Sequence, residues 1–241
     1  MINNDIGQAG FPRFLWAGDA CVVVEFGDHI DLDINARVRL EARKLEEAAP
    51  SWLVETVPTY RSLAVYIDPW SASRKEAMEG VQKICEGTGT IVAREAERVD
   101  LPVFYGEEYG PDMERVCSHT GLSPEKVVHL HSAPEYHVYM IGFSPGFPYL
   151  GEMDPALDTP RLGNPRTVIP AGSVGIAGMQ TGVYPSETPG GWNIIGRTPL
   201  KLFDPERRQP FLLGPGMTIR FVPVDRATFL QMSEKDGGPA R

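Results

Sequence analysis

Glycine and proline are concentrated in residues 142–216, which hold 13 of the 25 glycines and 12 of the 22 prolines of the chain. Aromatic and β-branched residues lie between them, rather than the serine and glutamine of a flexible linker. Proline fixes φ, and glycine permits backbone angles and close approaches that other residues resist. The stretch therefore predicts ordered loops between short strands, and such loops on a β scaffold are where binding sites are commonly built.

Short apolar runs rich in β-branched and aromatic residues predict strands through the second half of the chain. They lie at residues 136–141, 167–169, 174–176, 192–195, 200–203 and 218–222. Two short helices are expected before all of them, at 111–119 and 124–131, and Ser123 with Pro124 provides the start of the second. Many short strands favour a closed or nearly closed barrel, because closure removes exposed sheet edges.

The first half of the chain alternates between strand and helix patterns. Strands are expected at 19–26, 52–57, 63–67 and 90–93, and helices at 34–49, capped by Asp33, and at 73–85, where Ser73 and Glu76 match a capping box. The order β-α-β-β-α-β is that of a ferredoxin-like split unit. We therefore predict an α+β chain with a ferredoxin-like domain over residues 1–97, a β-barrel domain over 98–232 and a disordered tail over 233–241.

Charge and cysteine content argue against several classes of protein. The formal charge of −9 disfavours a surface for nucleic acid or for anionic membranes. The three cysteines lie far apart, so neither a disulfide framework nor a zinc site is expected. No run approaches the length of a membrane span, and residues 1–5 show no export pattern. These features predict a soluble protein in the reducing environment of the cytoplasm.

Three familiar motifs match in spacing and fail in context. Residues 191–198 have the spacing of a phosphate-binding P-loop, but Pro199 stands where that loop must become a helix. Residues 142–146 fit G-x-S-x-G, yet Pro145 opposes the strand-turn-helix elbow of a hydrolase. The glycines of 172–178 lack the helix of a dinucleotide site. No complete nucleotide loop or hydrolase triad is therefore predicted.

Four of the five histidines lie within residues 119–137. His129 and His131 are two apart on a predicted helix and so point in different directions, and no carboxylate or cysteine completes a ligand set. No metal site is therefore expected. His131 is interpreted as either facing a site or forming a hydrogen-bonded part of the structure.

Polar side chains are embedded in the glycine- and proline-rich loops, beside an apolar wall of Phe147, Tyr149 and Trp192. Such a set would hold a small anionic molecule, because arginine is well suited to carboxylate or phosphate. The alternative is that the arginines pair with acids and the aromatic residues fill the barrel. The polar residues are Arg166, Ser173, Gln180, Tyr184, Glu187, Asn193 and Arg197.

Long motifs spread over nearly the whole chain resemble one known family. They are RFL at 13–15, GDA at 18–20, EFG at 25–27, VPTYRSL at 57–63, LPVFYG at 101–106, HTGLSPE at 119–125, HSAPEY at 131–136, GFSPGFPYLG at 142–151, PRT at 165–167, PAGSVGIAG at 170–178, QTGVYP at 180–185, TPGGW at 188–192 and GRTPL at 196–200. The family is that of allophanate hydrolase subunit 1, also known as the B subunit of 5-oxoprolinase. The resemblance implies a ferredoxin-like domain followed by a cyclophilin-like β-barrel.

The resemblance also implies a function in a complex. Family members typically act with two further proteins, a sister C subunit of related fold and a separate A subunit, in the ATP-dependent opening of 5-oxoproline to glutamate. ATP, with Mg, would then be shared with the sister protein, and its phosphoryl group would make the lactam oxygen a leaving group. Related branches imply two alternatives, a urea carboxylase or allophanate hydrolase subunit in urea breakdown and a non-enzymatic inhibitor of a sensor histidine kinase.

The resemblance leaves the catalytic residues open. Our hypothesis is a half-site completed by a partner, in which Arg166 and Arg197 orient a carboxylate or phosphoryl group. Hydrogen bonds and an apolar wall would come from the remaining candidates for substrate binding. These are Ser173, Gln180, Tyr184, Trp192 and His131.

Overall fold

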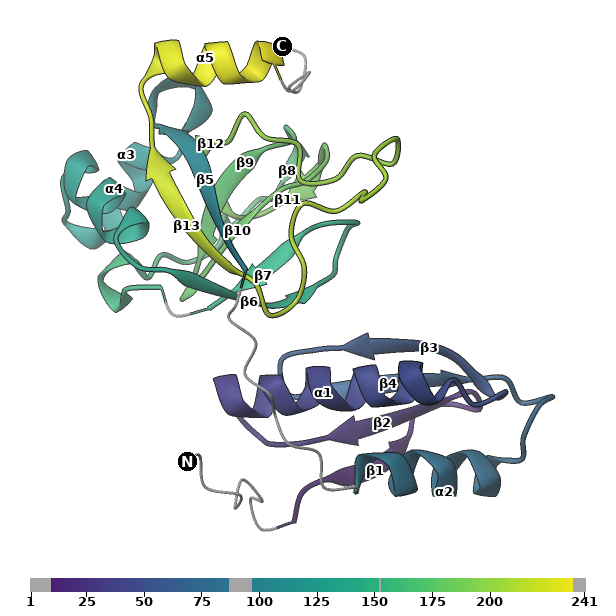
Figure 1. Ribbon diagram of the computed structural model, residues 1–241. Helices are drawn as coiled ribbons and strands as arrows, with labels where there is room; N and C mark the ends of the chain where they lie inside the picture. Colours follow the sequence, from purple (N-terminus) through teal and green to yellow (C-terminus); the bar gives the residue numbers. More distant parts are fainter. Residues whose placement is uncertain (1–9, 87–96, 152, 236–241) are drawn as a thin grey trace. The chain divides into compact units, whose positions relative to one another are not determined.

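The structure is a computed structural model that describes residues 10–86, 97–151 and 153–235. The chain divides into two compact units, Met1–Glu95 and Ala96–Arg241, each of which is described by itself (Figure 1). In the described ranges, no helix has the length and apolar character needed to cross a membrane.

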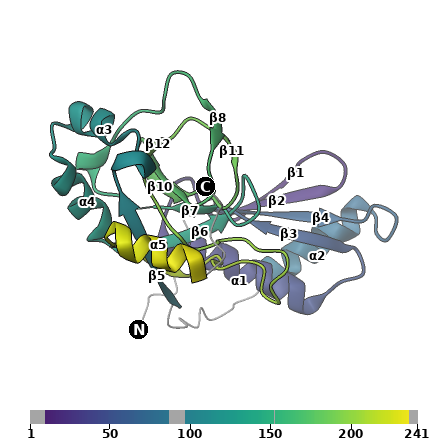
Figure 2. The same cartoon turned by 90° about the horizontal axis from the view of Figure 1, so that it is seen from above.

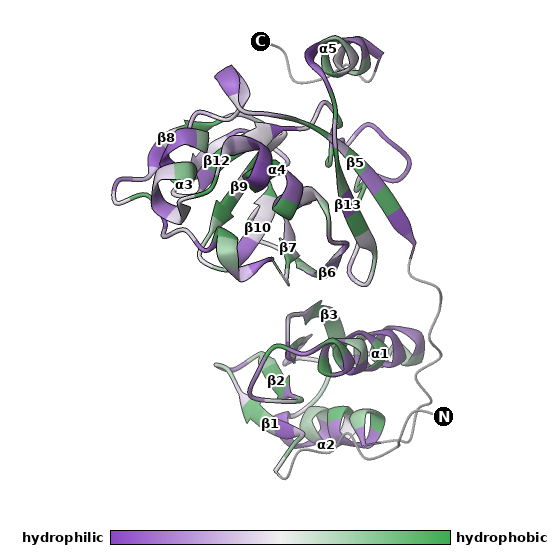
Figure 3. Ribbon diagram, turned by 90° about the vertical axis from the view of Figure 1, so that its left-hand side faces the viewer, coloured by the Kyte–Doolittle hydropathy of each residue, from purple (hydrophilic) through white to green (hydrophobic). Residues whose placement is uncertain are grey.

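The first unit contains one antiparallel sheet and two helices. Its strands β1 (Arg13–Trp16), β2 (Cys21–Glu25), β3 (Leu53–Pro58) and β4 (Ser62–Ile67) lie in the order β1-β2-β4-β3. Helices α1 (Leu32–Ala48) and α2 (Arg74–Cys85) cover one face of the sheet (Figure 3). The core between sheet and helices contains Val22, Val24, Leu63, Val65, Val38, Leu45 and Val81, all completely buried.

The edge position beside β2 is filled by β1, a strand that the sequence patterns did not predict. The strand expected at 90–93 lies outside the described residues. The other elements expected in this half are present, with their ends shifted by a few residues.

Side-chain caps fix the start of both helices in the first unit. The predicted cap of α1 was wrong, because Asp31 rather than Asp33 caps it and accepts the N–H groups of Asp33 and Ile34 at 2.9 and 3.0 Å. Asp31 has the extended backbone of a cap residue, whereas Asp33 already lies in the first helical turn. The capping box of α2 is confirmed, since Ser73 Oγ accepts the Glu76 N–H and Glu76 accepts the Ser73 N–H.

The second unit contains a closed barrel of seven strands, which confirms the barrel predicted from the sequence. The strands are β5 (Arg98–Tyr105), β6 (Tyr136–Ile141), β7 (Pro148–Leu150), β9 (Ser173–Ala177), β10 (Gln180–Val183), β12 (Asn193–Arg197) and β13 (Thr218–Pro223). Their order is β10-β7-β6-β13-β5-β12-β9, and β9 pairs with β10 to complete the circle. The pair formed by β5 and β13 is parallel.

Smaller elements surround the barrel. Strands β8 (Arg166–Ile169) and β11 (Thr188–Gly190) form a separate two-stranded sheet. Helices α3 (Met113–Thr120) and α4 (Pro124–Ser132) lie together on one side of the barrel (Figure 2), and Ser123 caps α4 as predicted. The short 3-10 helices η1 (Glu107–Tyr109) and η2 (Pro155–Leu157) lie in connections.

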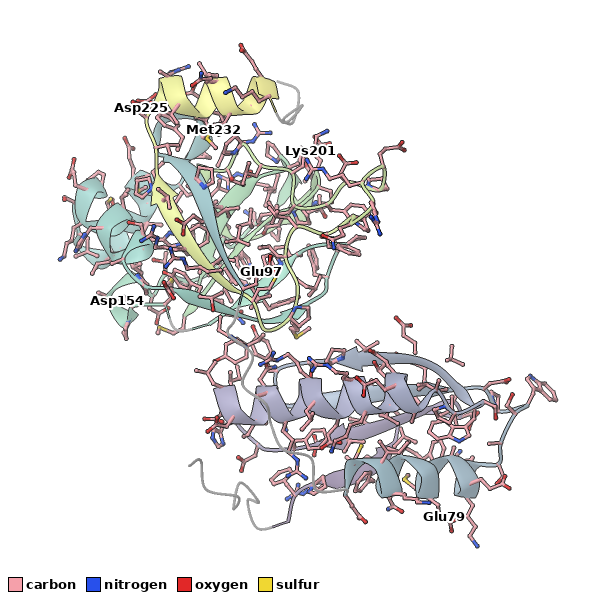
Figure 4. All side chains as sticks on the ribbon, viewed as in Figure 1. Glu79, Glu97, Asp154, Lys201, Asp225 and Met232 are labelled. Carbon is pink, nitrogen blue, oxygen red and sulfur yellow. The ribbon has the colours of Figure 1, made fainter. Side chains whose placement is uncertain are left out.

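The chain beyond the barrel forms helix α5 (Arg226–Lys235). The Thr228 N–H donates to Asp225 Oδ1 at 2.8 Å at the start of this helix, and Figure 4 labels Asp225 and Met232 there. Residues 233–235 of the expected disordered tail are therefore helical, and residues 236–241 lie outside the described part.

The segment 200–203 is not the strand that its alternating pattern predicted. It forms only an isolated bridge between Phe203 and Phe211, and the Leu212 N–H donates to the Leu202 carbonyl at 2.9 Å. Leu202 is buried in the core of the barrel unit. The apolar residues at 200 and 202 thus anchor a loop, and no neighbouring strand supplies a ladder.

Candidate functional site

An aromatic cluster packs on the outer surface of β9, β10 and β12, beneath Ile169 of β8. Phe147 contacts Tyr184 and Trp192 edge-on, with ring centroids 5.4 and 5.6 Å apart. Burial raises the pKa of the Tyr184 hydroxyl to about 12. At Gly182 a Cβ atom would lie 3.1 Å from both Phe147 and Trp192, so a larger residue there would press on both rings. The aromatic wall is a closely packed layer that supports the neighbouring loops.

Arg166 forms a bidentate ion pair with Asp112. Its Nη1 and Nη2 atoms donate to Asp112 Oδ2 and Oδ1 at 2.7 Å each, and the Ile194 N–H donates to Oδ2 at 2.7 Å. The Asp112 side chain is 7% exposed and that of Arg166 is 33% exposed. Arg166 is therefore paired with an acid, which is the alternative to ligand binding that the sequence left open. The ion pair connects α3, β8 and β12.

Asn193 has a structural environment. Its Oδ1 accepts a hydrogen bond from Arg115 Nε at 2.9 Å, and its Nδ2 donates to the carbonyl oxygens of Pro160 and Ile176 at 3.0 and 3.1 Å. The residue is completely buried. Because both ends of the amide are used inside the protein, Asn193 fixes the start of β12 and does not face a ligand.

Arg197 and Ser173 lie opposite each other on β12 and β9. Arg197 Nε donates to the Ala171 carbonyl at 2.8 Å, and the guanidinium lies 5.7 Å from the centroid of the Tyr109 ring. Arg197 forms no ion pair with a carboxylate of the described residues, and burial lowers the pKa of its guanidinium. Ser173 is 2% exposed. A half-buried cation beside a hydroxyl is suited to a carboxylate or phosphoryl oxygen.

Gly172 allows this arrangement. Its φ of +81° favours glycine, and a Cβ atom there would lie 2.5 Å from the Thr198 carbonyl oxygen and 3.4 Å from Arg197 Cγ. The Thr198 N–H donates to the Gly172 carbonyl at 2.9 Å. The turn before β9 therefore presses against the end of β12 and positions the Arg197 side chain.

Two other polar candidates lie at the edges of this region. Gln180 is partly buried at the start of β10, where it pairs with Ala177. Glu187 is exposed before β11. The structure thus brings Arg197 and Ser173 together, and it assigns Arg166 and Asn193 to the framework around them.

His131, near the end of α4, is completely buried, and its ring lies 4.4 Å from the ring of Phe221 on β13. The Thr181 hydroxyl donates to the Gly175 carbonyl at 3.1 Å, so His131 Nε2 is the donor in its 2.8 Å contact with Thr181 Oγ1. Its Nδ1 then accepts from the Tyr105 hydroxyl at 2.8 Å. Of its two proposed roles, the structure supports the hydrogen-bonded structural one. Burial lowers the pKa of His131 to about 3.

Because His131 is buried in its neutral form, we expect the free energy of unfolding to depend on pH. In the unfolded chain it takes up a proton below its ordinary pKa of 6.5, whereas in the folded chain it stays neutral down to about pH 3. Its contribution is therefore complete above pH 6.5 and falls by about 1.4 kcal/mol per pH unit below it. Urea unfolding at pH 7 and pH 4.5 measures this loss, and His131→Gln should lose about 3 kcal/mol less than the wild type. Equal losses in both proteins contradict the assignment.

A surface pocket of about 460 Å³ lies between α4, β5 and β13. None of the polar residues predicted from the sequence lines it, although Tyr105, the hydrogen-bond partner of His131, does. Its lining comprises Tyr105, Gly106, Met113, Pro124, Glu125, Val128, His129, Ser132 and Pro223.

The motif matches rejected from the sequence have other roles in the structure. Residues 193–197 of the P-loop-like stretch form β12, which pairs with β5 and β9 inside the barrel. Ser144 lies in a turn between β6 and β7, without the helix of a hydrolase elbow. Across the described ranges, no group of three or more potential metal ligands comes together.

The chain belongs to the carboxyltransferase domain family, subdomain C and D, which matches residues 12–213. Within it, the chain is 42% identical over 229 residues to the B subunit of 5-oxoprolinase from Bacillus subtilis, covering 91% of this chain and 92% of that protein. Urea amidolyase of Saccharomyces cerevisiae is 25% identical, and only 14% of it is covered. The crystal structure of TTHA0988 superposes with a TM-score of 0.75 at 38% sequence identity. The match covers 86% of this chain and 40% of the TTHA0988 chain.

Proposed function

We propose that the chain is the B subunit of an ATP-dependent 5-oxoprolinase, which works with two further proteins, a sister C subunit plus a separate A subunit, to convert 5-oxoproline to glutamate. The observation that carries this proposal is the similarity to the B subunit of 5-oxoprolinase over nearly the full length of both chains. The likeness to urea amidolyase is more distant and covers a small part of that protein, so the urea-related alternative is less favoured. No observation favours the kinase-inhibitor alternative.

The site supports this proposal through its charge. 5-Oxoproline carries a carboxylate beside its lactam, and ATP carries phosphoryl groups, so both present anionic oxygens. Arg197 offers a half-buried guanidinium that no described carboxylate neutralises, and Ser173 lies opposite it. ATP with Mg would supply the activation of the lactam oxygen. In the proposed half-site Arg197 and Ser173 hold an anionic group. Gln180 pairs with Ala177 at the other end of β9, away from this pair.

Three other candidates, Arg166, Tyr184 and Trp192, hold the elements around the site in place. Arg166 holds Asp112 and thereby the start of α3 against β12. Tyr184 and Trp192 belong to the packed layer that carries the turn before β9. We assign them supporting roles, and the sister protein supplies the rest of the site.

We also propose a ferredoxin-like first domain, a cyclophilin-like second domain and a cytoplasmic location. The order β2-α1-β3-β4-α2 and the sheet order support a ferredoxin-like first domain over residues 1–97, with β1 at the edge beside β2. The closed barrel with its flanking helices supports a cyclophilin-like second domain over 98–232. Cys21, Cys85 and Cys117 are all free thiols, which supports a cytoplasmic location.

Reconstitution with alternative substrates tests the function. The purified chain is mixed with the C and A subunits from the same genome, ATP and Mg²⁺, and then given 5-oxoproline, urea or allophanate. We expect glutamate from 5-oxoproline and no ammonia from the other two. Ammonia from urea or allophanate without glutamate from 5-oxoproline would assign the chain to urea breakdown. Omission of each protein in turn is the control.

A further inference from the structure

The loop between β6 and β7, residues 142–147, holds Phe143 in an unfavourable backbone conformation. The Ser144 N–H donates to the Gly142 carbonyl at 2.7 Å, which makes a three-residue γ-turn with Phe143 at its centre. The φ of Phe143 is +66°, a value that an aromatic residue rarely adopts. Glycine would fit this position without strain. Strain of this kind is typical of positions that have a function.

The loop is rigid rather than loose. The Phe147 N–H donates to the Ser144 carbonyl at 3.0 Å, across Pro145 and a Gly146 with φ of +85°, and the Gly142 N–H donates to the Phe147 carbonyl at 3.1 Å. Pro followed by a glycine of positive φ is the pattern of a type II turn. Two successive hydrogen-bonded turns therefore fix the direction in which the Phe143 side chain leaves the loop.

Phe143 is 64% exposed although it adjoins the aromatic cluster. Its ring contacts Phe147 edge-on with centroids 5.5 Å apart, and Phe147 is 2% exposed within that cluster. The ring thus rests on a rigid base while most of it faces solvent. A large apolar side chain on a strained and ordered backbone resembles an anchor residue of an interface.

A second exposed ring lies on the adjacent loop. A Cβ atom at Gly146 would lie 3.1 Å from Phe203 Cβ, so the two loops are in contact. Phe203 stacks on Phe211 with centroids 5.1 Å apart, and Phe211 is 46% exposed. We call Phe143, Pro145, Phe203 and Phe211 the aromatic rim. These residues lie on two loops that meet at Gly146 and Phe203, and exposed apolar side chains that gather on neighbouring loops mark sites of protein contact.

From this geometry we infer that the aromatic rim is the surface on which the sister C subunit docks, with Phe143 inserted into an apolar socket of that protein. The inference rests on the proposed function. An exposed apolar ring on a rigid loop is buried when it enters an apolar cavity of a binding partner. A protein surface can provide such a cavity, whereas a small metabolite cannot. In TTHA0988 more than half of the chain lies outside the part that matches this protein, so further polypeptide is joined to the same unit there.

Phe143→Gly separates docking from folding. The variant keeps the γ-turn and relieves its strain, so its melting temperature should equal or exceed that of the wild type. Its affinity for the purified C subunit, measured by isothermal titration calorimetry, should fall about 30-fold, as expected for an anchor residue. Phe211→Ala should also lower the affinity for the C subunit. Leu230→Ala on α5, which removes another exposed apolar side chain, is the matched control and should bind as the wild type does.

Three outcomes decide the inference. An affinity of Phe143→Gly within about twofold of the wild type overturns it and leaves the proposed function intact. If that variant instead changes the oligomeric state of the chain alone, the occupant is a second copy and the inference is wrong. A wild-type chain that binds no C subunit removes the occupant, and the reconstitution assay with 5-oxoproline then decides the proposed function separately.

Discussion

Arg197→Met should lower the rate of 5-oxoproline conversion by the reconstituted complex about 100-fold or more, without destabilising the chain. The substitution keeps the aliphatic stem against Gly172 and removes the guanidinium. Burial lowers the pKa of this group, so its charge is unfavourable in the folded chain unless an anion binds. The measurement is the initial rate of glutamate formation, with melting temperature as the parallel readout.

The controls for Arg197 distinguish charge from structure. Arg197→Lys retains a positive charge and loses the planar group that bonds the Ala171 carbonyl, so partial activity is expected. Arg226→Met removes an exposed arginine that pairs with Glu107 and Glu108, and it should leave the rate unchanged. Full activity in Arg197→Met would remove this residue from the site.

Asp112→Ala should lower the free energy of unfolding by about 3 kcal/mol. The substitution leaves the Arg166 guanidinium without its carboxylate and the buried Ile194 N–H without its acceptor. The partial exposure of Arg166 reduces the penalty, because water can reach that side chain. Urea unfolding followed by circular dichroism at pH 7 measures the change.

A double-mutant cycle isolates the ion pair. Arg166→Met alone leaves the buried carboxylate unpaired, and Asp112→Ala combined with Arg166→Met removes both charges. The double variant should be more stable than the sum of the single losses predicts, with a coupling energy of about 1 to 2 kcal/mol. Additive losses would contradict the framework role of this pair. Exposed Lys75→Met, beside Glu79, is the control with a loss close to zero.

Local signals in the sequence predicted the elements that depend on neighbours in the chain. The capping box at Ser73 and the start of α4 at Ser123 are set within one turn of helix, and both are confirmed. In the second half of the chain, strands β5, β7, β10 and β11 were missed. Each contains glycine or proline, and their pairing depends on distant partners. Segment 200–203 failed in the opposite way, since it has a strand pattern without a partner strand.

The candidate site depends even more on distant contacts. Asp112 and Arg166 are 54 positions apart, and Asp112 is marked in the sequence only by its place before a helix. For His131 the residues left two roles open, and only its complete burial with Tyr105 and Thr181 distinguishes them. The residue types alone predicted that arginines would bind an anionic group. The structure adds which arginine is paired and which has no described carboxylate partner.

We expect the barrel to supply half of a site that a second polypeptide completes. The most direct test is the rate of glutamate formation from 5-oxoproline, with ATP, Mg²⁺ and the A subunit held constant, for this chain alone, for the isolated C subunit, and for their equimolar mixture. We expect turnover only in the mixture. Conversion by this chain alone, or by the isolated C subunit, at the rate of the mixture would contradict a site shared between the two proteins.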